Sequence, residues 1–355
     1  MPKKSEKRRK PSPLNCTVSK KVLLRDQISE VLSGQLDRSK ESFDNPSVSL
    51  SGDSSSTLHE TIRGEEFTPH VKRAELVPQR LSTSFCSEQC TPKPPLQSRC
   101  EFHATVCTLD DVATVEAIER LATRYGRVLH MGVLDPTYKI FMNKARTAAL
   151  SFKVHSKVAL IMGDPLCEPC LFTNVLQEFK ECRRRYGWGV AFIGASEVFA
   201  QYAKEQKWTT VQFGVERVLN PLTNDILNER GGKRIIVQSK QLLNSSKGNI
   251  SLGLYIPAHG EDLNLQTEFA RVYDLWREGR NHPVGQKAFI SVYYPFSMPG
   301  MRVYIYTRGP DGLVNGFAAL RHLGANQGYH IDPCISAPGA PRGIADLLVF
   351  AAMTF

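Results

Sequence analysis

The 355-residue sequence has no apolar run that approaches the roughly 20 residues of a membrane-spanning helix. Its first residues, MPKKSEKRRKPSP, lack the apolar core of a secretory signal peptide. Nine cysteines, an odd number in a chain without such a signal, favour free thiols in a reducing compartment. These absences predict a cytoplasmic protein that is soluble or, at most, peripheral to membranes.

Several chemical signatures are also missing. No GxSxG motif is present, so the sequence does not support the nucleophile elbow of a serine hydrolase. The CEPC motif at 167–170 has no second CxxC pair and no HxxxH at zinc-finger spacing, whereas a structural zinc ion needs four ligands. We therefore expect no metal ion at this motif.

The net charge of +10 favours anionic partners such as RNA, nucleotides or acidic lipid surfaces. Residues 1–100 contain 17 basic and 12 acidic residues, and the rest of the chain contains 28 basic and 23 acidic residues. Each part therefore has the same excess of positive charge. The longer second part is only mildly basic, which is not typical of a dedicated DNA-binding domain. Arginines 183–185 end a predicted helix, where they complement the helix dipole.

Residues 1–100 lack sustained hydrophobic periodicity and are rich in basic residues, serine and proline. This composition buries too little apolar surface to offset the entropy of ordering, so the region is predicted to be mostly disordered. One weak helix is indicated at Val22–Leu36. The basic run Lys3–Lys10 is interpreted as a solvated tail, with a nuclear address or a contact with tRNA or anionic lipid as alternatives.

The folded part begins near Glu101, where strands and helices alternate. The predicted strands are 102–108, 148–154, 158–162, 189–193, 209–213, 233–237, 251–256, 288–293, 302–306, 316–322 and 329–335. The predicted helices are 109–125, capped by Thr108, then 171–186, 196–205, 263–280 and the segment from residue 344. The order of elements partly recurs after Leu263. We therefore predict an α/β fold with mixed sheets and two similar lobes, at 101–260 and 261–355.

The segment Gly328–Phe355 predicts a strand, a loop rich in glycine and proline, and an apolar helix. Unpaired N–H groups and the helix dipole at the start of such a helix suit a phosphate or another anion. The backbone of Gly339 and Gly343 and the side chain of Arg342 would contribute to this site. The alternative is an ordinary strand–turn–helix in which the glycines only make the bend.

Two residues at the end of this strand are candidates for catalysis. Asp332 could orient an amino group or a hydroxyl, or it could simply cap the Asp–Pro turn. His330 lies two residues earlier, on the same face of the predicted strand, and could act as a base or serve as a structural histidine. Both alternatives stay open for each residue.

The alternation of strands and hairpins, with a strand, a glycine-rich turn and a helix, resembles the GNAT acyltransferase fold. Four stretches are similar to the C-terminal catalytic domain of phosphatidylglycerol lysyltransferases, a tandem of two GNAT lobes: 163–165, 213–216, 232–234 and 343–346. The stretches ALSFKVHSKVALIMGDPLCEP, KWTTVQFGVERVLNPLTN and YIYTRGPDGLVNGFAALR resemble the fungal branch, the ergosteryl aminoacyl ester synthases. The resemblance covers residues 101–355.

The resemblance implies an aminoacyltransferase that has no tightly bound cofactor, uses aminoacyl-tRNA as co-substrate and esterifies the 3-hydroxyl of a membrane sterol such as ergosterol. The absence of a synthetase domain implies glycine rather than aspartate as the donated amino acid. Arg342, Gly339 and Gly343 would then hold the 3′-terminal phosphates of the tRNA. The residues expected at the tunnel or lobe interface are Glu216, Arg234, Lys153 and Asp164. Glu216 and Arg234 could instead pair with each other, and a solvated face and a turn cap are the alternatives for Lys153 and Asp164.

Members of the family continue past the helix that begins at Gly343, so the second lobe is expected to be incomplete at Phe355. The chain would then be a fragment or an inactive homologue. Three other functions stay open: a phosphatidylglycerol aminoacyltransferase, an acetyl-CoA-dependent acyltransferase, and a non-catalytic protein that binds tRNA or lipid. The sequence does not indicate an oligomeric state.

Overall fold

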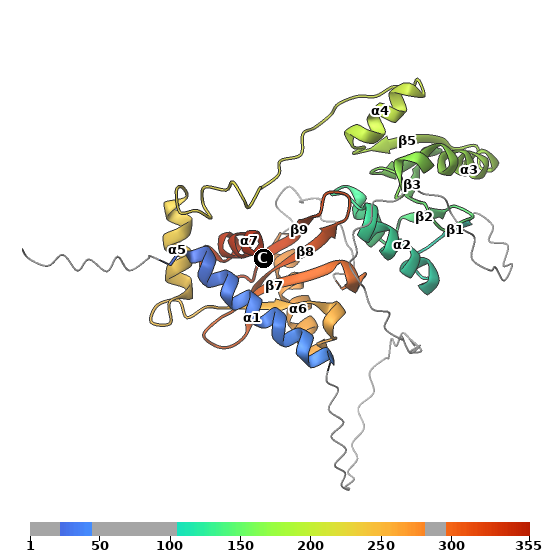
Figure 1. Ribbon diagram of the computed structural model, residues 1–355. Helices are drawn as coiled ribbons and strands as arrows, with labels where there is room; N and C mark the ends of the chain where they lie inside the picture. Colours follow the sequence, from blue (N-terminus) through green and yellow to red (C-terminus); the bar gives the residue numbers. More distant parts are fainter. Residues whose placement is uncertain (1–21, 45–104, 281–295) are drawn as a thin grey trace, which may run out of the picture. The chain divides into compact units, whose positions relative to one another are not determined.

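The computed structural model describes residues 22–44, 105–280 and 296–355, which belong to a single structural unit of the chain (Figure 1). The first sheet has five strands in chain order: β1 (Thr105–Cys107), β2 (Lys139–Met142), β3 (Ala149–His155), β4 (Val158–Met162) and β5 (Gly189–Ile193). Neighbouring strands are antiparallel except β4 and β5, which run parallel. Strands β3 and β4 form a hairpin, and Ser156 and Lys157 make its turn with positive φ angles.

The second sheet is antiparallel throughout and has four strands: β6 (Ser251–Tyr255), β7 (Arg302–Arg308), β8 (Val314–Leu323) and β9 (Gly328–Ser336). The two sheets and their helices confirm the predicted α/β fold class. Because β6 pairs with β7, residues 251–255 belong to the second sheet although the predicted second lobe begins at 261. The division into lobes at residue 260 stays a prediction.

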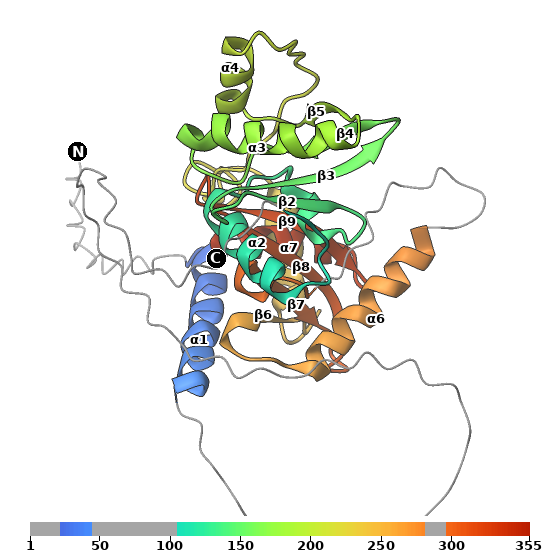
Figure 2. The ribbon, with the colours of Figure 1, turned by 90° about the vertical axis from the view of Figure 1, so that its right-hand side faces the viewer.

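Three helices accompany the first sheet: α2 (Val112–Tyr125), α3 (Phe172–Arg185) and α4 (Glu197–Glu205) (Figure 2). Asp111, not the predicted Thr108, caps α2, because its carboxylate accepts a hydrogen bond from the Thr114 N–H at 3.0 Å. Ser196 caps α4 in the same way, through the Phe199 N–H. Short polar side chains at these positions satisfy N–H groups that the helix itself cannot.

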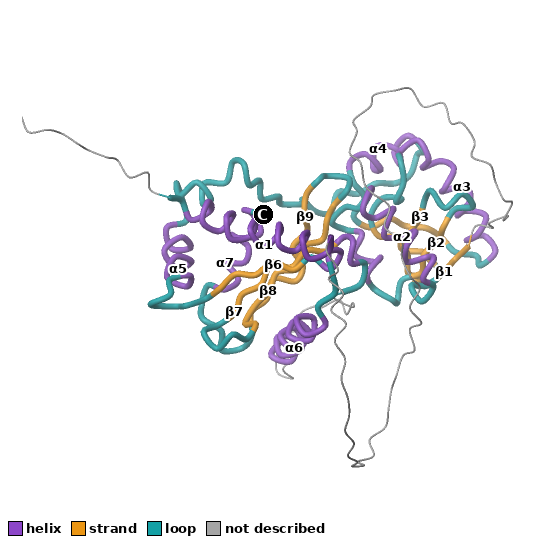
Figure 3. The backbone as a smooth tube through the Cα atoms, turned by 60° about the horizontal axis from the view of Figure 1, so that its bottom comes forward, coloured by secondary structure: helices purple, strands orange, loops and turns teal. Residues whose placement is uncertain are grey.

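The second sheet has helices on both faces (Figure 3). They are α1 (Leu24–Asp44), α5 (Lys233–Leu243), α6 (Leu263–Arg280) and α7 (Ile344–Thr354). Strand alternation divides the packing, because Val303 and Ile305 join the core under α1 and α7, whereas Tyr304 joins the core under α6. A side chain of this sheet therefore packs either against α1 and α7 or against α6, depending on the face it occupies.

Two strand predictions are wrong, and a third lies outside the described residues. Residues 233–237 begin helix α5, whose buried residues Ile236, Ser239 and Leu242 recur every three positions. The apolar run inside it was too short to distinguish a helix from a strand. Residues 209–213 form no strand, and Val211 and Phe213 are 79% and 74% exposed. The strand predicted at 288–293 falls between the described ranges.

Helix α1 is longer than the weak helix predicted at Val22–Leu36, and it packs against the second sheet. Leu24, Ile28 and Leu32 recur at helical spacing and are buried in the same core as α7. Tertiary packing therefore supplies the stability that the local sequence lacks. This helix lies within the region that was predicted to be mostly disordered.

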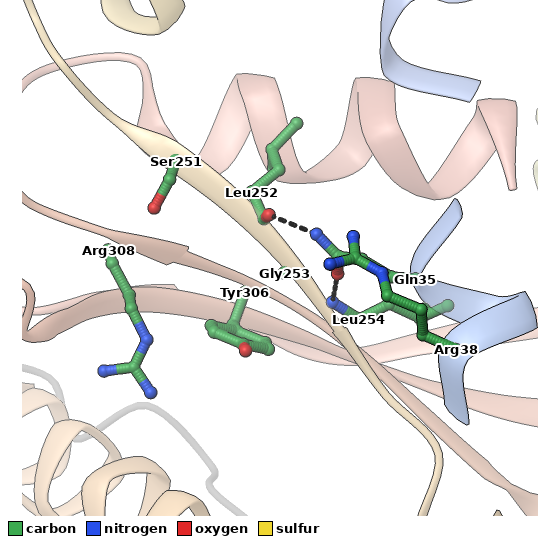
Figure 4. Close-up of a pocket in the computed structure, with 8 residues that line it drawn as sticks. All are labelled: Gln35, Arg38, Ser251, Leu252, Gly253, Leu254, Tyr306 and Arg308. Atoms are coloured by element: carbon green, nitrogen blue, oxygen red, sulfur yellow. Dashed lines mark hydrogen bonds between the residues drawn. The ribbon is translucent and has the colours of Figure 1, made fainter. Parts of the chain in front are cut away.

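The side chain of Gln35 on α1 continues the hydrogen bonding of β6 at the edge of the second sheet (Figure 4). Its amide nitrogen donates to the Leu252 carbonyl at 2.9 Å, and its amide oxygen accepts from the Leu254 N–H at 2.5 Å. A shallow cavity of about 340 Å³ adjoins this contact. The single amide thus occupies two backbone groups that an unprotected edge strand would offer to another chain.

We expect the Gln35→Ala variant to be less stable by about 1–3 kcal/mol, because it leaves both edge groups without these bonds. The Gln35→Glu variant keeps the acceptor but loses the donor, so its stability should fall between the other two proteins. Urea denaturation of the three proteins measures this series. Equal denaturation midpoints would show that water replaces the amide at no cost.

Candidate functional site

Two arginines and a histidine form a row across three strands of the second sheet. Arg302 on β7 lies directly opposite Arg321 on β8, which lies opposite His330 on β9. Directly opposed residues share a face of the sheet, with Cβ atoms about 5 Å apart. The two arginines are only 2% and 1% exposed. We call these three residues the Arg–Arg–His row.

Asp332 lies two residues beyond His330, at an irregularity in the β8–β9 ladder. Ile331 is opposite Leu320 and Cys334 is opposite Ala318. Two residues of β9, Asp332 and Pro333, therefore lie opposite the single residue Ala319 of β8, which is the arrangement of a β-bulge. The peptide bond that follows Asp332 is cis. Ile331 and Cys334 pack towards α1 and α7, which leaves Asp332 on the α6 face together with the row.

Helix α6 brings an aromatic hydroxyl and a further cation to this face. Burial raises the pKa of Tyr273, the Arg277 guanidinium lowers it, and the Asp332 carboxylate raises it. This influence indicates that the Asp332 side chain lies near Tyr273. The Arg277 guanidinium carbon lies 5.6 Å from the centre of the Tyr273 ring. The α6 face therefore combines three arginines, a carboxylate, an imidazole and a phenol.

Arg321 also connects the second sheet to the segment that follows α2. Its Nη2 atom donates to the carbonyls of Arg127 and Val128 at 3.2 and 2.8 Å. Arg127 in turn donates from Nη1 to the Asn326 side chain in the β8–β9 turn at 3.0 Å. The two carbonyl bonds hold the guanidinium of Arg321 in place, and the bond to Asn326 ties the same segment to the β8–β9 turn.

The electrostatic environment keeps His330 neutral at pH 7. Burial is the main cause that lowers its pKa to about 4, and the charges of Arg321 and Arg302 contribute to the same shift. Its Nδ1 atom has no hydrogen-bond partner among the described residues. A neutral imidazole nitrogen of this kind can accept a hydrogen bond from a substrate hydroxyl.

The predicted anion-binding loop has a defined shape. Gly343 caps α7 at φ 95°, and a Cβ there would lie 2.5 Å from the Gln238 side chain, so glycine is required. The Gln238 amide donates to the Arg342 carbonyl at 2.6 Å, while the Arg342 side chain is exposed. Gly339, at φ 81°, borders open space. Asp346 already places a carboxylate in the first turn of α7, where the dipole would favour an incoming anion.

The predicted catalytic pair and the predicted phosphate loop belong to different faces of the sheet. Helix α7 packs through Ile344, Leu347 and Leu348 on the face opposite Asp332 and His330. The roles assigned to Arg342, Gly339 and Gly343 therefore stay predictions, separate from the row.

The four residues predicted at a tunnel or lobe interface are dispersed, and the alternative pairing of Glu216 with Arg234 is wrong. Arg234 pairs with Asp346 at 3.2 Å rather than with Glu216, which is exposed. Asp164 is buried, at 5% exposed, and its partners lie outside its own turn. Its carboxylate accepts from the Ser196 N–H at 2.7 Å and from Arg127 at 3.1 Å.

Lys153 is partly exposed, with a side chain that is 39% accessible, and it also has partners of its own. Its Nζ atom lies 3.0 Å from Asp135 and 4.3 Å from the centre of the Tyr138 ring. The structure thus places the two predicted catalytic residues, Asp332 and His330, on one face of the sheet, and it adds residues that sequence reasoning missed. The available signal was an arginine in a strand, since Arg302 alternates with the aromatic residues Tyr304 and Tyr306.

The described ranges lack both a metal-binding cluster and a membrane-spanning helix. They contain no group of three or more His, Cys, Asp or Glu side chains that could hold a metal ion. Burial raises the pKa of Cys167 in the CEPC motif to about 12, so this thiol stays protonated at neutral pH. No helix in the described parts of the chain has both the length and the apolar character needed to cross a bilayer.

Residues 120–354 match the family described as "Phosphatidylglycerol lysyltransferase, C-terminal". Among curated proteins, the chain is 23% identical over 204 residues to the lysylphosphatidylglycerol biosynthesis bifunctional protein LysX of Rhodococcus jostii. It is 22% identical over 229 residues to the phosphatidylglycerol lysyltransferase of Staphylococcus haemolyticus. These matches cover 57% and 63% of this chain but only 17% and 25% of the relatives, so the chain spans a small part of their length.

A solved structure shares the fold. L-PGS from Bacillus licheniformis aligns with a TM-score of 0.55 at 17% sequence identity, covering 67% of this chain and 70% of that one. At this identity the likeness concerns the fold alone. The resemblance to the fungal ergosteryl enzymes stays a prediction.

Proposed function

Because the chain belongs to the family of the phosphatidylglycerol lysyltransferase C-terminal domain, we propose that it transfers an aminoacyl group from aminoacyl-tRNA to a hydroxyl of a membrane lipid. The observation that carries this proposal is the Arg–Arg–His row with Asp332 beside it on one face of the second sheet. The aminoacyl ester is already activated, so positioning supplies much of the rate without a metal ion or an acyl-enzyme.

In the proposed reaction, the lipid hydroxyl attacks the carbonyl carbon of the aminoacyl ester. A new C–O bond forms, the bond to the ribose oxygen breaks, and the hydroxyl proton ends on that ribose oxygen. The row contributes guanidinium groups that stabilise the oxyanion of the tetrahedral intermediate. Fixed donors are effective here because Arg321 is already held by two carbonyls and needs little reorganisation.

We assign His330 to the attacking lipid hydroxyl and Asp332 to the amino group of the aminoacyl donor. The neutral His330 imidazole accepts the hydrogen bond of the attacking hydroxyl at Nδ1. A pKa near 4 makes it a weak base, so its main effect is to orient the hydroxyl. Asp332 carries the carboxylate that attracts the positively charged amino group of the donor.

The acceptor that we favour is phosphatidylglycerol. The relatives' names refer to this lipid and to lysine, and the buried cations Arg302 and Arg321 suit a lipid with a phosphate better than a neutral sterol. The glycyl ester of ergosterol, implied by the resemblance of the ALSFKVHSKVALIMGDPLCEP stretch, is the second candidate.

The test is lipid extraction after incubation of the full chain with membranes and labelled lysyl-tRNA or glycyl-tRNA. Parallel membranes contain either phosphatidylglycerol or ergosterol, so the labelled product identifies both the acceptor and the amino acid. We expect label in the phosphatidylglycerol fraction that ribonuclease abolishes. Transfer from acetyl-CoA that survives ribonuclease would replace the proposal with an acetyltransferase, and tRNA binding without any transfer would support a non-catalytic protein.

A further inference from the structure

Three aromatic rings lead from the core of the first sheet to the surface at the end of α3. Phe152 on β3 is fully buried, and its ring centre lies 5.9 Å from that of Trp188. Trp188 stacks on Tyr186 at 4.5 Å with an angle of 15° between the rings. Tyr186 is 59% exposed. A stacked pair that ends at solvent offers a flat surface on which another planar group can stack.

The backbone holds these rings in place. The Trp188 N–H donates to the Arg183 carbonyl at 3.1 Å, and the Arg183 side chain donates back to the Trp188 carbonyl at 2.8 Å. Gly187, at φ 66°, makes the turn between the two rings. The Gly189 N–H then donates to the Lys157 carbonyl, which fixes the segment beside β4. Because the rings are ordered in advance, a ligand that stacks on them loses less binding energy to ordering.

Four exposed cationic residues lie on the segments that adjoin the rings: Arg184 and Arg185 in the last turn of α3, Lys157 in the β3–β4 turn, and Lys139 at the start of β2. The Nζ atom of Lys139 lies 5.8 Å from the centre of the Trp188 ring. None of the four forms an ion pair within the described ranges. We call these residues, with Tyr186 and Trp188, the α3-end surface.

The helix dipole alone does not explain this arrangement. It accounts for arginines at the end of α3. It does not account for the two lysines, which come from the β3–β4 turn and from β2, or for an exposed aromatic ring near them. Exposed cations around an open aromatic face are typical of surfaces that bind single-stranded nucleic acid.

We propose that the α3-end surface binds an unpaired stretch of the tRNA, with a base stacked on Tyr186 and backbone phosphates on Arg184, Arg185 and Lys157. This inference rests on the proposed function, in which aminoacyl-tRNA is the donor. It adds a second tRNA contact, formed by the first sheet and its helix, to the reacting end at the row. A bilayer surface fits less well, because Trp188 is covered by Tyr186 and the exposed group is a flat ring among cations.

The test measures binding of fluorescently labelled tRNA to the full chain over a series of salt concentrations. The Tyr186→Ala variant should lose about tenfold in affinity with an unchanged salt dependence, whereas Tyr186→Phe should bind like the wild type. The double variant Arg184→Gln/Arg185→Gln should lower the slope of log K against log salt by about 1.4, since each single-strand phosphate contact contributes about 0.7. Arg120→Gln, an exposed arginine on α2, is the matched charge control and should change neither quantity.

Two further measurements separate the possible failures. If the surface variants bind tRNA like the wild type but lose binding to phosphatidylcholine vesicles with one part in three phosphatidylglycerol, the surface is a membrane contact and the inference is wrong. In the transfer assay, Tyr186→Ala should raise KM for aminoacyl-tRNA at constant kcat. If Tyr186→Ala transfers normally with an unchanged KM, this inference is wrong but the proposed function stands. Loss of tRNA affinity in a chain that never modifies lipid would overturn only the proposed function.

Discussion

Asp332→Asn is expected to lower aminoacyl transfer by at least about a hundredfold, which is the lower end of the range for a positioned acid–base or orienting carboxylate. The substitution keeps the size of the side chain but removes the charge that attracts the donor's amino group. Binding of tRNA should stay within about threefold, because contacts with its phosphates carry most of that affinity. Single-turnover transfer and tRNA binding, measured on the same preparation, check the two halves of this expectation.

The matched control is Asp274→Asn, which removes a neighbouring carboxylate. Asp274 lies on α6 beside Tyr273 and is exposed, and it too influences the pKa of that tyrosine. If both variants lose activity equally, a general change in the field around Tyr273 is responsible. If Asp332→Asn keeps more than a third of the wild-type rate, the α6 face of β9 is not where transfer occurs.

Some elements, among them a short strand and a long amphipathic helix, could be predicted to the residue. The bounds of β5 and α6 agree with the predicted ranges 189–193 and 263–280. Helix α5 could not be predicted, because its apolar Ile235–Val237 run suits a strand equally well until Leu242 is seen to share the buried face. The full extent of helix α1 could not be predicted either, because its apolar residues stabilise the helix only when they pack against the core of the second sheet.

The candidate site was predictable only in part, for a related reason. Asp332 and His330 stand out in the sequence as polar residues in a strand before a glycine-rich loop. Arg302 and Arg321 are 19 positions apart in the chain and become neighbours through the β7–β8 register alone. The β7–β8 ladder has an irregularity between Thr307 and Arg308 that shifts the register, and no signal in the sequence marks it, so the row could not be recognised from the sequence.

The stability of the folded protein is expected to fall by about 3 kcal/mol between pH 6.5 and pH 4 because of His330. Its pKa is about 4 in the folded protein, whereas an unfolded histidine titrates near 6.5. Between these values the unfolded state binds the extra proton, so stability falls as the pH falls. The contribution is complete above pH 6.5 and is lost on approach to pH 4. Urea denaturation at intervals of half a pH unit measures the slope.

The His330→Gln variant removes this titration and should flatten the curve by the same amount. Burial also lowers the pKa of His130, which adds a loss in the same direction, and burial raises the pKa of Glu119, which acts in the opposite direction. Both groups remain in the variant, so the difference between the two curves isolates His330. Parallel curves would mean that the folded protein keeps His330 as readily charged as the unfolded chain does. His330 could not then offer the attacking hydroxyl a neutral nitrogen at mildly acidic pH, and Asp332 would have to orient both reactants.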